Sequence, residues 1–108
     1  DRGDRFLDRT YTAGEKEYCS SQPRPGTHYA GRFAAKEAIM KCMGHGLGQD
    51  GVAFRDIEVI RAESGAISAV LHDKTADVAV GLGIERFEVS ISHTDTVAVA
   101  FAVALGRA

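Results

Sequence analysis

The sequence predicts a small α+β domain in which a mainly antiparallel sheet packs against one long helix. Three observations support this fold class. A run that contains no Pro, and no Gly except Gly31, predicts a helix over 28–43. Apolar and polar residues alternate over 87–92, which is the two-residue period of a half-buried strand. The run 97–105 is apolar on both faces, so it predicts a strand that is covered or lies at an interface.

Two short helices are expected ahead of the long one. The charged stretch 1–9 is typical of the last part of a helix. Thr12 and Glu15 have the spacing of a capping box, which predicts the start of a second helix that runs to about Ser20. The segment 21–26, SQPRPG, ends this helix because two prolines and a glycine do not continue one.

A loop and two strands are expected after the long helix. Gly44 stands where a helix C-terminal cap belongs, and it opens the glycine-rich run 44–51, which predicts a loop. Strands are expected over 54–61 and 66–71, joined by a turn at 63–65.

The last part of the chain predicts one more helix and a closing hairpin. The helix is expected over 74–82, with Asp73 as its N-cap and Gly83 as its stop. The hairpin turn is expected at 93–96. No repeat or linker interrupts the order of elements, so 1–108 is predicted to be a single domain.

Composition and charge limit the classes of function. A net charge of −2 argues against nonspecific nucleic-acid binding by the whole domain, so an anionic ligand requires a local cluster of basic residues. The chain contains no apolar run of about 18 residues and no signal-peptide pattern, which predicts no membrane association. Cys19 and Cys42 do not form a metal or disulfide framework. Free thiols in a reducing compartment, and hence a cytoplasmic protein, are expected.

The first candidate site lies on the long helix. Phe33, Glu37 and Lys41 are spaced by four residues, so they share one face. A carboxylate there suits Mg²⁺, which prefers oxygen ligands and often bridges to substrate phosphates. Arg32, Lys36 and Lys41 would then hold phosphate charge. On spacing alone, an ordinary solvated face with a Glu37–Lys41 pair is the better explanation of the same residues.

Two further segments have candidate ligand-binding features. The glycines of 44–51 can bring backbone N–H groups close to a phosphate, although a plain connecting loop has the same composition. His93 follows a strand end, where binding groups are common, and a turn histidine is the alternative. A Ser–His–Asp hydrolase is disfavoured, because the three residues within 90–95 are sequence neighbours and a triad must converge from separate elements.

Arginines form a stripe near the start of the chain. Arg2, Arg5 and Arg9 recur at spacings of three and four, which places them on one helix face. The stripe suits docking of an acidic protein. Aspartates form a neighbouring stripe, so a solvated face with internal pairs is the alternative.

Together these segments resemble the holo-acyl-carrier-protein synthase family of phosphopantetheinyl transferases. The resemblance rests on RFAAKEA (32–38), GHG (44–46), FRDIEV (54–59), SISHTD (90–95) and the apolar last strand, in that order. The segment FLDRTYTAGEKEYC (6–19) matches the part that precedes them in the family. The resemblance covers nearly the whole chain, and a similar domain occurs at the end of fungal-type fatty acid synthases.

The resemblance implies the small phosphopantetheinyl transferase fold and a homotrimer with active sites in the clefts between subunits. It implies Mg²⁺-dependent transfer of the 4′-phosphopantetheine arm from coenzyme A to a serine of an apo acyl carrier protein, with release of 3′,5′-adenosine bisphosphate. Glu37 matches the metal-binding glutamate, and Lys41 would stabilise the departing phosphate. Arg5 and Arg9 match the face that meets the carrier. The residues expected to contact coenzyme A are Arg32, Lys36, Gly44, His45, Gly46 and His93.

The chain departs from the family in two places. The family begins with a strand that carries Gly-x-Asp, whose aspartate is a metal ligand, and the sequence does not contain this segment. His45 replaces the threonine of the usual Gly-Thr-Gly. Two other functions therefore stay open. One is a trimeric coenzyme A or nucleotide binder without transfer activity, and the other is a metal-dependent phosphodiester hydrolase.

Overall fold

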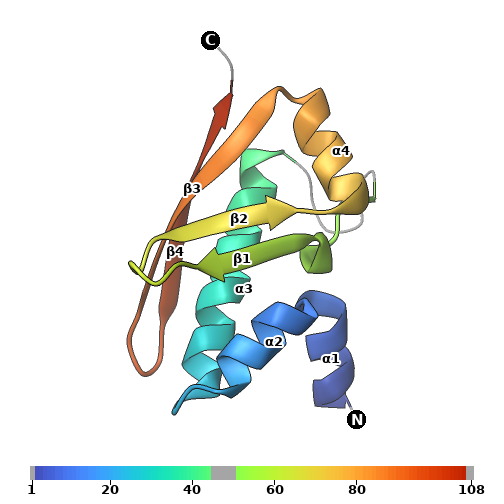
Figure 1. The fold of residues 1–108 in the computed structure, drawn as a ribbon. Coiled ribbons are helices and arrows are strands. Elements are labelled where there is room, and N and C mark those ends of the chain that lie inside the picture. Colours follow the sequence, from blue (N-terminus) through green and yellow to red (C-terminus); the bar gives the residue numbers. More distant parts are fainter. Residues whose placement is uncertain (1, 45–50, 107–108) are drawn as a thin grey trace.

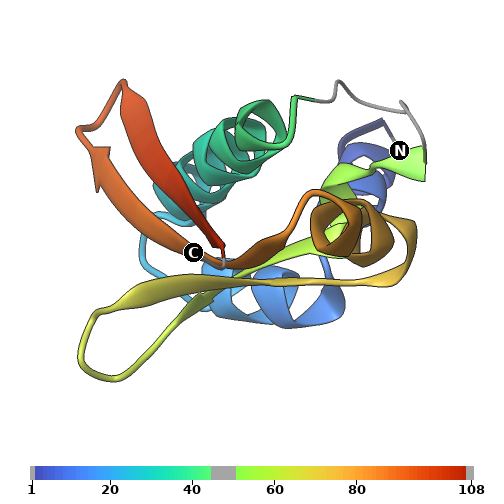
Figure 2. The ribbon, with the colours of Figure 1, turned by 90° about the horizontal axis from the view of Figure 1, so that it is seen from above.

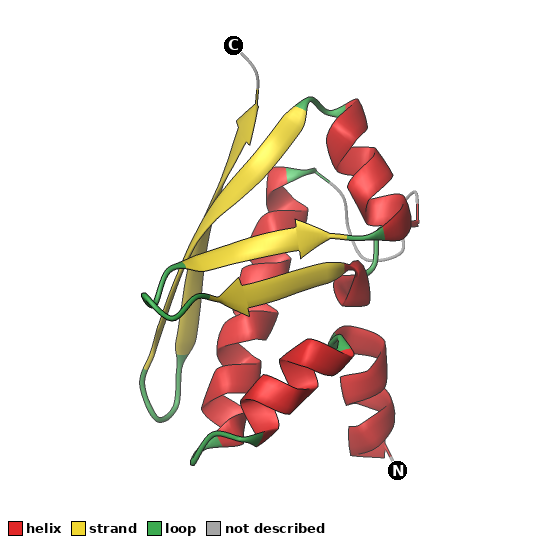
Figure 3. Ribbon diagram, in the orientation of Figure 1, coloured by secondary structure: helices red, strands yellow, loops and turns green. Residues whose placement is uncertain are grey.

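Four helices and a four-stranded sheet make up the described part of the chain, residues 2–44 and 51–106 of a computed structural model. In chain order the elements are α1 (Arg2–Thr10), α2 (Ala13–Ser20), α3 (Pro25–Cys42), a 3₁₀ turn (Phe54–Asp56), β1 (Ile57–Arg61), β2 (Ile67–Leu71), α4 (Asp73–Gly81), β3 (Ile84–His93) and β4 (Ala98–Gly106). The sheet has the order β1-β2-β3-β4, and all its neighbours are antiparallel (Figures 1 and 3). The predicted α+β class is confirmed.

The capping box forms as the sequence predicts. The Glu15 amide donates to Thr12 Oγ1 over 3.2 Å, and the Thr12 amide donates to Glu15 Oε1 over 2.9 Å. These two bonds satisfy backbone donors at the start of α2, which have no partner within the helix. The helix ends at Ser20, as expected.

Helix α3 begins earlier than the sequence predicts. Its first residue is Pro25, because proline fits the first helical position, where its missing N–H is not needed and its fixed φ suits a helix. The helix ends at Cys42, and Gly44 follows with a φ of +71°. A left-handed glycine here confirms the expected C-terminal stop.

The start of α4 corrects a prediction. Asp73 is not the N-cap but the first helical residue, with a φ of +52°, and the cap position belongs to His72. The helix start is held instead by the 3₁₀ turn: the His72 amide donates to the Asp56 carbonyl oxygen, and Thr75 Oγ1 donates to Asp56 Oδ2. Gly83 follows the helix with a φ of +77°, as predicted for its stop.

Two strand boundaries also differ from the expectation. The segment predicted as strand from Phe54 first makes the 3₁₀ turn, so β1 begins at Ile57. Phe54 packs there against Phe33 of α3, with ring centroids 5.1 Å apart. Strand β3 begins at Ile84, three residues before the alternating run.

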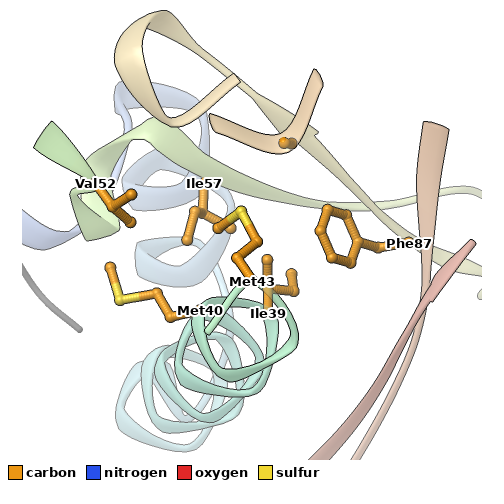
Figure 4. Packing of buried hydrophobic residues seen from close by; sticks show 7 residues of the cluster. Ile39, Met40, Met43, Val52, Ile57 and Phe87 are labelled. Carbon is orange, nitrogen blue, oxygen red and sulfur yellow. The ribbon is translucent and has the colours of Figure 1, made fainter. Parts of the chain in front are cut away.

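The hydrophobic core lies between α3 and the sheet. Side chains from α3, from the segment before β1 and from β1, α4 and β3 point toward one another there (Figure 4). Each large side chain removed from water contributes about 1.5–3 kcal/mol. The core residues are Ile39, Met40, Met43, Val52, Ile57, Ala79 and Phe87.

The sheet curls around α3 (Figure 2). Helices α1 and α2 gather where α3 begins, and α4 lies away from the turn between β3 and β4 (Figure 1). Ala102 and Ala104 of β4 pack against the core, whereas Val99, Phe101 and Val103 point outward and are exposed. Strand β4 was expected to be covered or to lie at an interface, and one of its two faces is open in the single chain.

Two other sequence predictions can be compared with this structure. Cys19 and Cys42 are free thiols, the first buried and the second exposed, as expected. Among the described helices, none has the length and apolarity that crossing a membrane requires.

Candidate active site

Glu37 lies at an open hollow beside α3. Phe6 of α1, Tyr11 and the α3 residues Tyr29 and Phe33 give the hollow aromatic walls, and its volume is about 500 Å³. The carboxylate of Glu37 is partly exposed, so it is accessible to a cation or to a substrate. Helix α3 thus presents an acidic group in a largely apolar surrounding, as the spacing of Phe33 and Glu37 predicts.

The chemistry of this hollow fits Mg²⁺ held by one protein ligand. An accessible carboxylate offers the oxygen that Mg²⁺ prefers, and the ion commonly takes its other ligands from water and substrate phosphates. Within residues 2–44 and 51–106, no group of three His, Cys, Asp or Glu side chains could hold a metal by itself. Glu37 is the only carboxylate among the described residues that line this hollow, so further ligands would come from the substrate, from water or from residues that do not line it.

Lys41 lies one turn further along α3 and is exposed. Of the ion pairs among the described residues, none joins Glu37 to Lys41. The simple intrahelical pair, which was the alternative explanation for this spacing, is therefore not formed. Both charged groups remain accessible to a ligand.

Lys36 is in a different place from the one the sequence analysis expected. Its side chain is fully buried, and its ammonium donates to Glu15 Oε1 over 2.8 Å and to the carbonyl oxygens of Phe54 and Ile57. Burial lowers the pKa of Lys36, and the Glu15 carboxylate opposes this shift. The three donors of an ammonium are all used inside the protein. The expected contact between Lys36 and a coenzyme phosphate is therefore not available in this arrangement.

A second, smaller hollow collects basic and imidazole side chains. Arg32 of α3, Arg61 of β1, His93 of β3 and His28 of α3 all line it. The rings of His28 and His93 meet edge to face, with centroids 5.8 Å apart. The site therefore offers positive charge and hydrogen-bond donors from three elements, which suits a phosphate group.

Arg32 is the most buried of these groups. Only 6% of its surface is exposed, and its guanidinium lies 4.3 Å from the centroid of the Tyr18 ring. Its Nε is buried and has no hydrogen-bond partner. An unpaired buried donor of this kind is energetically costly.

The pKa of His28 is affected by the neighbouring groups of the basic hollow. Burial lowers the pKa of His28, and the positive charges of Arg32, His93 and Arg61 lower it further. A bound anion would offset that repulsion. Sequence reasoning did not identify His28, although its position four residues before Arg32 on a helix was a usable signal. No local sequence pattern indicated Arg61 as a site residue, because only the tertiary fold brings the end of β1 close to α3.

A third hollow adjoins the other two. It has a volume of about 270 Å³ and lies between the start of α3 and the turn that joins β3 to β4. Ala30 and Ala98 line both this hollow and the Glu37 hollow, whereas Thr27 and His93 line both this hollow and the Arg32 hollow. The structure thus places Glu37 and Arg32 at separate hollows, each of which shares two lining residues with the third.

An ion pair crosses the third hollow. Arg24, before α3, pairs with Asp95 in the β3–β4 turn, and both side chains are largely exposed. The pair ties the turn that follows His93 to the start of α3. Asp95 is thereby engaged with an arginine on the surface, away from the Glu37 hollow.

The arginine stripe lies beside the aromatic hollow. Arg5 and Arg9 are exposed on α1, and Phe6 of the same helix lines the hollow that contains Glu37. Asp8 pairs with Lys16 of α2. Of the remaining predicted residues, Gly44 ends α3, whereas His45 and Gly46 lie outside the described residues.

Comparisons with known proteins identify the family. The family described as the 4′-phosphopantetheinyl transferase superfamily matches residues 1–102. The holo-[acyl-carrier-protein] synthase of Koribacter versatilis (strain Ellin345) is 49% identical over 98 residues, which cover 91% of this chain and 78% of that protein. The fatty acid synthase subunit alpha of Schizosaccharomyces pombe is 40% identical over 99 residues, 92% of this chain but 5% of that subunit.

A solved structure shows the same fold. The crystal structure of Helicobacter pylori holo-[acyl-carrier-protein] synthase in complex with coenzyme A has a TM-score of 0.79 and 28% sequence identity to this chain, over 94% of this chain and 82% of that one. The chain belongs to the 4′-phosphopantetheinyl transferase superfamily. The resemblance drawn from RFAAKEA and SISHTD is confirmed.

Proposed function

We propose that this chain transfers the 4′-phosphopantetheine arm of coenzyme A to a serine of an apo acyl carrier protein and releases 3′,5′-adenosine bisphosphate. The observation that carries the proposal is the placement of Glu37 and Arg32. One helix lines one hollow with the partly exposed Glu37 and another with Arg32, and a third hollow shares lining residues with both. The similarity to synthases, one of them solved with coenzyme A, supports both substrates.

The reaction exchanges the phosphoanhydride bond of coenzyme A for a phosphate ester of the carrier serine. The serine oxygen attacks the phosphorus on the pantetheine side of the coenzyme A diphosphate, and the bond from that phosphorus to the bridging oxygen breaks. The serine proton is lost, and the bridging oxygen leaves with 3′,5′-adenosine bisphosphate. Such transfers need little covalent help from a protein and depend on alignment and on stabilisation of negative charge.

Glu37 and Lys41 are the proposed catalytic residues. Glu37 would hold Mg²⁺, which when bound neutralises charge on the diphosphate. Lys41, one turn along the same helix, would meet the negative charge of the departing phosphate. Glu37 is also our candidate to accept the proton of the carrier serine.

The basic hollow is the proposed place for phosphate of coenzyme A. Arg32 and His93 would contact it, as the family resemblance implies, and His28 and Arg61 add donors from two further positions. We also propose that the glycine-rich segment 44–46 contacts coenzyme A. Lys36 is not a proposed contact, because its three donors are engaged in the core.

The exposed surfaces suggest where partners bind. Arg5 and Arg9 flank Phe6 on α1, so an acidic carrier that docks on them would approach the Glu37 hollow. The outer face of β4 exposes Val99 and Phe101 to 60% and 69%. Apolar area of this kind is costly to leave in water, and we propose that it is covered in a homotrimer.

One incubation tests the proposed function against its two rivals. The protein is mixed with coenzyme A, Mg²⁺ and an apo carrier protein, and the carrier is followed by mass spectrometry. Transfer increases the carrier mass by one phosphopantetheine arm and needs the acceptor serine, so a carrier with Ser→Ala is the control. Coenzyme A cleaved without a gain in carrier mass would indicate a hydrolase. Coenzyme A that is bound but intact would indicate a binding protein, and either result would refute the proposal.

A further inference from the structure

Glu15 lies in the core and holds three donors from three parts of the chain. Only 2% of its surface is exposed. Its Oε1 accepts from the Thr12 amide over 2.9 Å and from Lys36 Nζ over 2.8 Å, and its Oε2 accepts from the Val59 amide over 2.8 Å. One carboxylate therefore joins the start of α2 to α3 and to β1.

Lys36 extends the same network. Besides Glu15, its ammonium donates to the carbonyl oxygens of Phe54, in the 3₁₀ turn, and of Ile57, the first residue of β1. It also lies 5.4 Å from the centroid of the Tyr11 ring. With all three donors engaged, the side chain has one arrangement that satisfies it. The rotation of α3 about its own axis is thereby set at the position of Lys36.

The position of Glu37 depends on this rotation, since it is the next residue on the helix. If Lys36 is held inward, Glu37 is held at the aromatic hollow and Lys41 is held one turn beyond it. A displacement of a reacting group by about 1 Å can cost on the order of 10²-fold in rate. A small rotation of α3 is therefore enough to affect transfer.

The network also sets the corner between α1 and α2. Thr12, which Glu15 bonds, is the N-cap of α2 and stands two residues after the end of α1 at Thr10. Tyr11, between the helices, donates to the Tyr29 carbonyl oxygen of α3 over 2.7 Å. Helix α1 presents the proposed carrier-docking arginines and Phe6, so its orientation affects how a carrier reaches Glu37.

A role in stability alone is a weak explanation for a buried ion pair. Removing two charges from water costs several kcal/mol, and well-packed neutral replacements are often as stable or more stable. A polar network in which every group has a partner instead favours one defined arrangement of the elements that it joins.

We propose that Glu15 is a positioning residue for phosphopantetheine transfer: through Lys36 it holds α3 so that Glu37 faces the aromatic hollow in line with the docking helix α1. This inference rests on the proposed function of Glu37 as the catalytic, metal-binding residue. Glu15 itself touches no substrate in this assignment.

The test removes the charges as a pair. Glu15→Gln combined with Lys36→Met leaves no unpaired buried charge and keeps the side chains close to their original size. We expect kcat to fall at least tenfold, because α3 carries Glu37 and Lys41 and is no longer held at one rotation; the KM for coenzyme A is measured alongside. Arg86→Met with Glu88→Gln, which removes an exposed pair on β3, is the matched control and should leave both constants unchanged.

A second readout does not depend on turnover. Binding of Mn²⁺, as a probe for the Mg²⁺ site, is followed by electron paramagnetic resonance in the presence of coenzyme A. The double variant should bind Mn²⁺ several-fold more weakly than the parent. A parent that binds Mn²⁺ but transfers nothing would refute the proposed function, and the change in Mn²⁺ affinity would still decide the role of Glu15.

Glu15→Asp covers the case in which the double variant does not fold. It keeps the charge and shortens the side chain by one methylene, so the pair is retained with a displaced helix. We expect a lower kcat and weaker Mn²⁺ binding with a melting temperature close to that of the parent. Parental kcat and Mn²⁺ affinity in a folded variant of either design would overturn the proposal, as would a loss of activity that matches the unfolded fraction.

Discussion

Lys36 and Glu37 are consecutive on α3, yet the Lys36 side chain is fully buried while the Glu37 side chain lines an open aromatic hollow. Successive helical residues lie about 100° apart around the axis, so one motif serves both the core and the surface. Within RFAAKEA, Lys36 ties α3 to β1 and α2, and Glu37 faces the solvent. Lys36 and Glu37 of this motif therefore have different roles, the first in the core and the second at the candidate site.

The first prediction concerns Glu37. Glu37→Gln keeps size and helix propensity but removes the charge that would hold Mg²⁺, so the fold should survive. Loss of such charge stabilisation costs about 2.7–4 kcal/mol, or roughly 10²–10³-fold in rate. Transfer activity and its dependence on Mg²⁺ concentration, measured in protein that includes the family's Gly-x-Asp strand, check this expectation.

Asp95→Asn is the control for the Glu37 variant. Asp95 is a carboxylate in an exposed turn next to the ligand-binding region, but its partner is Arg24 at the surface. An exposed pair contributes about 0–1 kcal/mol, so the variant should transfer at a near-parental rate. If instead Glu37→Gln stayed active and Asp95→Asn did not, the metal would have to be assigned to the turn.

The second prediction concerns carrier docking. Reversing both Arg5 and Arg9 to Glu should raise the KM for the carrier steeply, weaken its salt dependence and leave the KM for coenzyme A unchanged, because charges at an interface mainly steer association. Steady-state kinetics at several salt concentrations measure this. Lys74→Glu with Arg86→Glu makes the same change in net charge on α4 and β3, and should have little effect. Equal effects of the two double variants would remove the docking role of α1.

Local signals in the sequence predicted local structure well. The capping box of Thr12 and Glu15 and the stop at Gly44 involve residues within one or two turns, so the sequence alone was sufficient to place them. The start of α3 was misplaced because Pro25 can end one helix and begin another. Asp73 was misassigned because Asp56, distant in sequence, holds the start of α4.

The candidate site was predicted less completely, for a physical reason. The sequence motifs indicated Glu37, Arg32 and His93. The structure places Glu37 at the aromatic hollow and the other two at the basic hollow. The side chain of Lys36 belongs to the core through a partner, Glu15, that lies 21 residues away. Pairing over such a distance depends on how the helices pack, and no spacing rule within one element reveals it. The contribution of Arg61 to the basic hollow was missed for the same reason.

The third prediction is a pH dependence of stability that arises from His28. Burial, followed by the charges of Arg32, His93 and Arg61, lowers the pKa of His28 from its ordinary value of 6.5. The ring of Tyr18 contacts it from α2 and adds no charge. Between the lowered pKa and 6.5 the unfolded chain binds a proton that the folded chain does not, so stability falls as the pH falls through this window.

His28→Gln should reduce this dependence, because glutamine has no proton to gain. The measurement is the free energy of unfolding in denaturant at closely spaced pH values from neutral to acidic, for parent and variant. The difference between the two curves should be constant above the ordinary pKa and should shrink below it. Parallel curves over the whole range would show that His28 titrates alike in both states.

The fourth prediction concerns the outer face of β4. Phe101 is 69% exposed in the single chain, and a chain of this size buries a modest share of its surface by itself. We expect the parent to be a trimer and Phe101→Glu to be a monomer by light scattering at micromolar concentration. Val80→Glu, at another exposed apolar position on α4, should leave the trimer intact. A parent that is monomeric at this concentration would contradict the expectation.

The last prediction concerns the close approach of α3 to β3. Alanine is favoured over glycine inside a helix by about 0.5–1 kcal/mol, so Gly31→Ala should stabilise α3 if propensity alone decided. A Cβ atom at Gly31, however, would lie 2.9 Å from Cγ2 of Ile91, which is closer than carbon atoms tolerate. Isoleucine is branched at Cβ and stiff, so it cannot move aside easily. Overpacking of this kind costs about 1–3 kcal/mol, and we expect Gly31→Ala to be destabilising.

Denaturant unfolding of the single variants and of Gly31→Ala with Ile91→Ala gives a double-mutant cycle, in which the alanine at 31 should become neutral or favourable once Ile91 is removed. Gly26→Ala, at a position of α3 where a Cβ meets nothing within 4 Å, is the matched control and should be neutral or stabilising. A stabilising Gly31→Ala with Ile91 still present would mean that β3 moves away from α3 at little cost.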